Sequence, residues 1–144
     1  MSKILSKSEL VSAKDYFAEI LLSSRMLKFV NIEVKIVSGN APSGLCIIDE
    51  YNNQNKPRSF TIEINKNQSK MEILNAVAHE MVHVKQYAKG ELKFHERRNL
   101  VTFQREQYQD DDYWESLWEI EAYGREVGLY QKFRPTLKLL KKEI

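Results

Sequence analysis

The chain has 144 residues and a formal net charge of +2, with 29% charged and 42% hydrophobic residues. These values are typical of a single globular domain, here residues 1–144, that can bury a sizeable core. So small a net charge predicts neither a nucleic-acid partner nor a membrane partner. No apolar run reaches the length of a signal peptide or membrane span, and the single cysteine, Cys46, excludes an intrachain disulfide. We therefore expect a cytoplasmic protein.

The first half of the chain predicts one helix followed by three strands. Ser6 and Glu9 have the spacing of a capping box, and apolar residues at helical spacing predict a helix from about Ser8 to Leu27. Apolar residues then alternate with polar ones, or follow one another directly where a strand is expected to be covered on both faces. The alternating strands are Val30 to Ile36 and Phe60 to Asn65, and the continuously apolar one is Leu45 to Tyr51.

The segment from Ser69 to Gly90 predicts a helix with both ends defined. Ser69 and Glu72 have capping-box spacing, and Gly90 can adopt the left-handed conformation that ends a helix. At its centre lies the HExxH motif, His79-Glu80-Met81-Val82-His83. Residues four apart leave the same face of a helix about one turn apart, and two imidazoles at that separation can bind one zinc ion.

Glu80 lies about 100° away from His79 around the helix axis. It therefore cannot bind the metal in line with His79 and His83, but it can reach a water molecule on that metal. The motif predicts His79 and His83 as ligands of Zn²⁺ and Glu80 as the general base. The ligand types would also accept another divalent metal.

The second half of the chain predicts a polar connection and one more helix. Glu91 to Asp112 shows little periodicity, which predicts a loop with room for short strands or turns. The pattern becomes helical from Tyr113 to about Phe133, and Pro135 lies just beyond the expected end of this helix. Helices and short strands in this order predict an α+β fold.

A catalytic zinc site usually has a third protein ligand. The candidates are His95 and the carboxylates of the last helix. Glu121 lies within about 60° of Trp114 and Trp118 around the helix axis, so we expect it on the buried stripe. A buried carboxylate needs a partner, and zinc would provide one. Glu121 is therefore the preferred third ligand.

Alternatives stay open for several of these residues. Glu121 could form an ion pair with Arg125, one helical turn further on. His95 is the second candidate for the third ligand, or a hydrogen-bond donor near the site. Glu119 and Glu126 line up on a face that we expect to be solvated, so they are predicted to be surface charges.

The segments HEMVHVKQYAKGEL and YWESLWEIEAYGREVGLY resemble small zinc metallopeptidases of the gluzincin type, including short ones encoded by bacteriophages. The resemblance covers roughly Phe60 to Leu129. It implies a zincin-like fold, in which an N-terminal backing helix and a small twisted sheet of three to four strands pack on the HExxH helix. A C-terminal helix then carries the third ligand. The residues implied for the site are the ligands His79, His83 and Glu121, with Glu80 as general base.

Two features of that family have no clear counterpart here. The aspartate expected four residues beyond the ligand glutamate, where it would steady the first histidine, is replaced by Arg125. The residue that stabilises the oxyanion is also unassigned. Its candidates are Tyr108, Tyr113, Tyr123 and His95.

The sequence therefore predicts a zinc-dependent metallopeptidase, in which Glu80 takes a proton from the attacking water and passes it to the leaving amine. A peptide or protein substrate could pair with Phe60 to Asn65, which we expect to be an edge strand bordering the cleft. The alternative is a catalytically inactive, zinc-stabilised domain that binds a protein partner. Nucleic-acid binding through Arg97, Arg98 and the lysine-bearing C-terminal tail is disfavoured, because the sequence shows no concentrated basic face.

Overall fold

The structure is a computed structural model that describes residues 5–95, 99–110 and 113–142. Arg97 and Arg98 lie outside the described residues, so the nucleic-acid interpretation that depends on them gains no support. The described part of the chain is an α+β fold with three α-helices, one short 3₁₀ helix and two three-stranded sheets. The predicted α+β class is confirmed.

Helix α1 (Lys7–Leu21) begins with the predicted capping box. The Glu9 backbone N–H donates to Ser6 Oγ at 3.1 Å, and the Ser6 backbone N–H donates to Glu9 Oε1 at 3.0 Å. The helix ends six residues earlier than Leu27, because Leu22 is extended and buried. The 3₁₀ helix η1 (Met26–Lys28) follows.

The first sheet has the strand order β1–β3–β2, formed by β1 (Asn31–Val37), β2 (Gly44–Tyr51) and β3 (Pro57–Asn65). Strand β3 pairs parallel with β1 and antiparallel with β2. The prediction that Phe60 to Asn65 forms an edge is therefore wrong, because these residues lie in the middle strand. Strand β2 is an edge instead, and it is partly exposed rather than covered on both faces.

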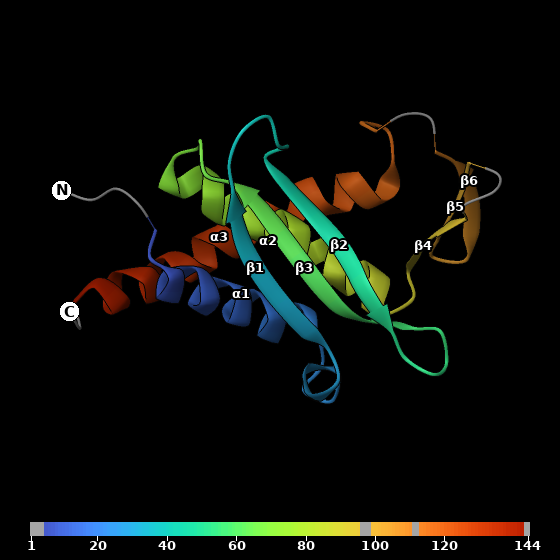
Figure 1. Cartoon of the computed structure of the whole chain (residues 1–144), viewed down its shortest axis with the longest axis horizontal. Coiled ribbons are helices and arrows are strands. Elements are labelled where there is room, and N and C mark those ends of the chain that lie inside the picture. Colours follow the sequence, from blue (N-terminus) through green and yellow to red (C-terminus); the bar gives the residue numbers. More distant parts are fainter. Residues whose placement is uncertain (1–4, 96–98, 111–112, 143–144) are drawn as a thin grey trace.

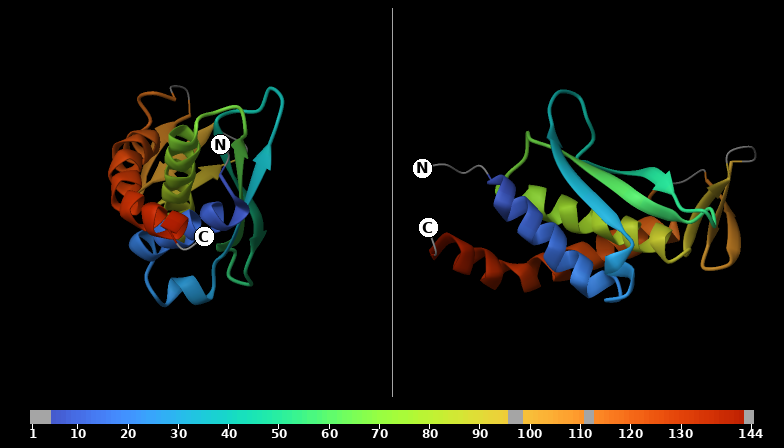
Figure 2. Two further views of the ribbon diagram at one scale, coloured as in Figure 1. Left: turned by 90° about the vertical axis from the view of Figure 1, so that its left-hand side faces the viewer. Right: turned by 60° about the horizontal axis from the view of Figure 1, so that its bottom comes forward.

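Helix α2 (Lys70–Ala88) is the most buried element, and both of its predicted ends are confirmed. Ser69 and Glu72 exchange capping-box hydrogen bonds of 3.1 and 2.9 Å, and Gly90 has φ +74°. All three α-helices lie on one face of the first sheet, with α2 between the sheet and α3 (Figures 1 and 2). The motif helix therefore contacts both the sheet and the helix that carries the candidate carboxylates.

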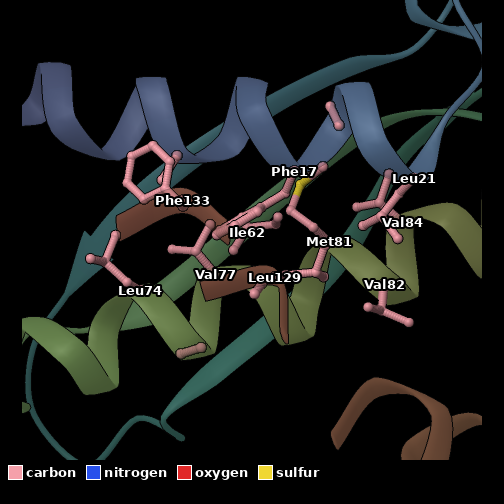
Figure 3. Close-up of a cluster of buried hydrophobic side chains, with 14 of the residues drawn as sticks. Phe17, Leu21, Ile62, Leu74, Val77, Met81, Val82, Val84, Leu129 and Phe133 are labelled. Carbon is pink, nitrogen blue, oxygen red and sulfur yellow. The ribbon is translucent and has the colours of Figure 1, made fainter. Parts of the chain in front are cut away.

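Helix α3 (Leu117–Lys142) continues beyond the predicted end and contains Pro135. Proline removes one backbone hydrogen bond, but buried residues on either side, Phe133 and Leu137, hold the helix against the core. The Phe133 ring centroid lies 5.7 Å from that of Phe17 and 5.4 Å from that of Tyr16. Figure 3 shows Phe133 beside Phe17 in the core shared by α1, α2 and the sheet.

The second sheet is antiparallel and follows α2 directly, in the segment predicted as a loop with room for short strands. A second apolar cluster joins this sheet to the start of α3, where Trp118 packs against Leu92, Val101 and Phe103. None of the helices in the described residues is both long enough and apolar enough to cross a membrane. The three short strands are β4 (Leu92–His95), β5 (Leu100–Phe103) and β6 (Glu106–Gln109).

We expect Phe133→Ala to destabilise the fold by about 3–5 kcal/mol, because the ring is fully buried where α3 packs against Phe17 of α1. Urea denaturation would measure the change in the free energy of unfolding. Leu139→Ala, on the same helix but 60% exposed, is the control and should change stability by no more than about 0.5 kcal/mol. A loss for Phe133→Ala that matches this control would contradict the packing of α3 on α1.

Candidate metal centre

His79 and His83 project from α2 toward α3, and both are buried. Their Nε2 atoms lie 3.0 and 3.1 Å from a single oxygen, Oε1 of Glu119. Within the described residues, these three side chains form the group of possible metal ligands, with one ligand atom from each lying within 4.8 Å of the other two. The two predicted histidine ligands are therefore brought together, and a carboxylate joins them.

That carboxylate is Glu119 and not Glu121, so the predicted position of Glu121 beside the histidines is wrong. Glu121 Oε2 accepts hydrogen bonds from Lys85 Nζ at 2.7 Å and from Arg125 Nε at 3.1 Å. The alternative ion pair with Arg125 is therefore present, together with a closer one to Lys85.

Glu121 was predicted as the third ligand because the wrong face of the last helix was taken to be buried. The prediction used Trp114 as an anchor, but the helix begins only at Leu117 and Trp114 is 70% exposed. The side of α3 that faces the protein instead carries residues spaced three and four apart. Two of them are the glutamates that were predicted to be surface charges, and the others are apolar. The positions are Glu119, Ala122, Glu126, Leu129 and Phe133.

The other ring nitrogen of each histidine also has a partner. His79 Nδ1 lies 3.0 Å from Glu126 Oε1, and His83 Nδ1 lies 2.8 Å from Gln86 Oε1. An ionised carboxylate only accepts hydrogen bonds, so His79 Nδ1 must be the donor. Glu126, seven residues beyond Glu119, therefore orients His79. It provides the carboxylate that was expected at the position occupied by Arg125.

Gln86 fixes the protonation of His83 in the same way. Its amide nitrogen donates to the Trp118 carbonyl oxygen at 3.0 Å and to Glu121 Oε1 at 2.8 Å. The amide oxygen therefore faces His83, whose Nδ1 must donate to it. Glu121 thus contributes to the site indirectly, by orienting the glutamine that orients a histidine.

With both Nδ1 atoms protonated, the Nε2 atoms of neutral imidazoles present lone pairs to the Glu119 carboxylate. Two lone pairs and an anionic oxygen repel one another unless a positive charge lies among them. Zinc–ligand distances of about 2.0–2.1 Å place tetrahedral ligand atoms roughly 3.3 Å apart. The 3.0 and 3.1 Å separations from Glu119 Oε1 are close to this value, so the three residues fit a zinc ion.

The electrostatics of the site also favour positive charge. Burial lowers the pKa of His79, but its hydrogen bonds to Glu119 and Glu126 outweigh burial and raise that pKa from 6.5 to about 9. Burial raises the pKa of Glu119, yet the hydrogen bonds from both histidines dominate and lower it to about 2. In the metal-free chain, protons on the imidazoles supply the charge that a divalent cation would otherwise bring.

Glu80 lies beside this group, near the start of strand β2. A Cβ atom on Gly44 would lie 3.0 Å from Glu80 Oε2 and 3.1 Å from Glu80 Cγ, so any larger residue at position 44 would press on the Glu80 side chain. Burial raises the pKa of Glu80 above 4.5, although both histidines oppose the shift. The predicted general base is therefore held in place by an element distant in sequence.

The four candidates for an oxyanion donor separate into two pairs. His95 Nε2 hydrogen-bonds Thr102 Oγ1 at 2.7 Å, and the Tyr108 hydroxyl donates to Glu106, so both are engaged within the second sheet. The remaining pair lies at the site. The Tyr123 ring centroid is 4.4 Å from that of His79, and the Tyr123 and Tyr113 hydroxyls are 3.2 Å apart.

We expect Glu119→Ala to weaken zinc binding far more than Glu121→Ala. Glu119 offers a ligand atom, whereas loss of Glu121 acts through Gln86 and should cost about 10–100-fold in affinity. Competition with a chromophoric chelator would measure both dissociation constants. Glu33→Ala, at an exposed position of β1, is the control and should leave the affinity unchanged. A larger effect for Glu121→Ala than for Glu119→Ala would contradict this assignment.

Comparison of the chain with protein-family models, with curated proteins and with solved structures found no match. The resemblance to gluzincin-type peptidases therefore stays a prediction from the sequence segments that carry it.

Proposed function

We propose that the chain is a zinc-dependent metalloendopeptidase with a zincin-like fold. The proposal is carried by the convergence of the imidazoles of His79 and His83 with the Glu119 carboxylate, beside the buried carboxylate of Glu80. Two nitrogen ligands and one oxygen ligand are a donor set found in catalytic zinc sites, which keep a further position open. Zinc bound there would lower the pKa of a water molecule and polarise a substrate carbonyl.

Glu80 is the group proposed to move protons. Its carboxylate takes a proton from the attacking water and later gives that proton to the leaving amine. Burial raises the pKa of Glu80 above the usual value of a carboxyl group, which makes its carboxylate a stronger base for the proton of the water. Glu126 and Gln86 keep Nδ1 of the two imidazoles protonated, which leaves each Nε2 available for the metal.

An open cleft supports cleavage within a chain rather than at its end. Two cavities, of about 590 and 340 Å³, are both lined by His79 and Glu80. Their volumes fall within the range of roughly 300–1,000 Å³ that is usual for ligand sites. A peptide whose scissile bond lies beside Glu80 could therefore place side chains in both cavities.

Strand β2 replaces β3 as the proposed docking edge. It begins at Gly44, against Glu80, and pairs with β3 on one side only within the described residues. An extended substrate that added to this edge would align its backbone through main-chain hydrogen bonds. The peptide bond nearest Gly44 would then lie beside the general base.

Tyr113 is the proposed donor to the carbonyl oxygen as negative charge develops there. It lines both cavities, and its hydroxyl is hydrogen-bonded to Tyr123, whose ring packs on His79. Burial raises the pKa of Tyr113, with further contributions from Tyr123 and Glu119, so the hydroxyl keeps its proton at neutral pH.

Glu80→Gln should leave zinc affinity unchanged and abolish hydrolysis, lowering the rate by at least about 10²–10⁴-fold. A mixed peptide library analysed by mass spectrometry would measure cleavage, and Glu33→Gln is the control. Hydrolysis by the zinc-loaded Glu80→Gln protein at the wild-type rate would contradict the mechanism. If wild type binds zinc fully yet cleaves no peptide, the chain is instead a zinc-stabilised domain that binds a partner.

Gly44→Ala should lower the rate of hydrolysis several-fold while leaving zinc affinity intact. The added methyl would lie 3.0 Å from Glu80 Oε2, so the carboxylate would have to shift by a few tenths of an ångström, and misplacing a catalytic group slows the reaction. Gly128→Ala is the matched control, because a Cβ there meets no atom within 4 Å. Equal activity of the two variants would mean that Gly44 does not position Glu80.

A further inference from the structure

The two cavities beside the metal centre differ in chemistry. In the larger one, polar side chains such as Gln68, Asn75 and Gln131 alternate with the apolar Met71, Ala76 and Val127. In the smaller one, the charged residues are those of the metal centre itself, and the remaining wall is largely apolar. That apolar wall consists of Leu45, Cys46, Tyr87, Leu92, Phe94 and Trp118.

The apolar wall comes from four separate elements, β2, α2, β4 and α3, and is partly open to solvent. Leu45 on β2 is 43% exposed and Phe94 on β4 is 42% exposed, although each lines the same cavity. Exposed apolar side chains that share a cavity are typical of a binding surface. A ligand that covered them would gain from removing this surface from water.

The wall is also held in place by aromatic packing. The Phe94 ring lies edge-on to Trp118, with centroids 6.1 Å apart and an interplanar angle of 84°, and its centroid is 6.3 Å from that of Tyr87. Trp118 is 3% exposed and belongs to the apolar cluster of the second sheet. The second sheet therefore fixes one side of the cleft beside the general base.

We infer that the smaller cavity is a specificity subsite for an apolar side chain, aliphatic or aromatic, of the residue next to the cleaved bond. The inference rests on the proposed peptidase function, because the substrate is what would place a side chain there. Continuity with the metal centre supports it, since His79, Glu80, His83 and Glu119 also line this cavity. A charged side chain would lose its hydration against the apolar wall. Of the two carboxylates that line this cavity, Glu119 is already hydrogen-bonded to both histidines.

The test measures binding in a chain that cannot hydrolyse the probe. Fluorescein-labelled peptides of one Ala/Gly sequence, with Leu, Phe, Ser or Lys at a single central position, are titrated with full-length, zinc-supplied Glu80→Gln protein. Anisotropy should give dissociation constants at least about tenfold lower for Leu and Phe than for Ser or Lys. Equal affinities for the four peptides, or no detectable binding of any, would overturn the inference.

Shortening a side chain of the apolar wall tests whether the preference for apolar peptides arises in the smaller cavity. Adding Phe94→Ala to the Glu80→Gln protein should reduce the discrimination between Leu and Ser about tenfold. Phe29→Ala is the matched control, because Phe29 is 58% exposed and lines neither cavity. Leu45→Ser repeats the test from the other side of the cavity if Phe94→Ala fails to fold. Unchanged discrimination in a folded wall variant would overturn the inference.

Cleavage by the wild-type chain separates this inference from the proposed function. If the protein binds the Leu and Phe peptides selectively but cleaves none of them, the apolar subsite is supported and the proposed peptidase function is contradicted. Cleavage without preference for an apolar neighbour would sustain the peptidase and refute the subsite.

Discussion

The structure depends on a charge constraint between α2 and α3. Each imidazole has its Nδ1 hydrogen committed, His79 to Glu126 and His83 to Gln86, so both Nε2 atoms face the Glu119 carboxylate. Such an arrangement is favourable only with positive charge at its centre. In the metal-free chain, protons on the imidazoles provide this positive charge, and the pKa of His79 is accordingly raised to about 9. A metal ion would meet it with both imidazoles neutral.

The fold provides what this constraint needs. Residues 79 to 86 of α2 pair with residues 118 to 126 of α3 in antiparallel order, so one helix pair supplies the candidate ligands and the groups that orient them. Lys85 is buried and forms ion pairs with Glu91 and Glu121, which neutralise charge at the end of this network. The first sheet adds strand β2, whose Gly44 accommodates Glu80. The second sheet adds Leu92 and Phe94 to the apolar wall.

Much of this could be predicted from local patterns. The capping box at Ser69, the glycine end of α2 and the histidine spacing are all encoded within one segment, so the sequence alone located His79, Glu80 and His83 on one helix. The carboxylate that lies beside the two histidines could not be found in the same way, because the face of α3 that is buried depends on where that helix starts and what packs on it. Trp114 was a misleading anchor, whereas the regular steps from Glu119 through Ala122 to Phe133 contained the correct signal. The strand order was beyond reach for a similar reason, since alternation in β3 does not reveal whether one or two strands pair with it.

The most direct test of the account is the position of zinc in a crystal of the zinc-loaded protein, measured by anomalous diffraction at the zinc absorption edge. The account predicts one strong peak between α2 and α3, about 2.0–2.2 Å from His79 Nε2, His83 Nε2 and a Glu119 carboxylate oxygen. A peak coordinated by Glu121, or no peak near the two histidines at full zinc occupancy, would contradict it.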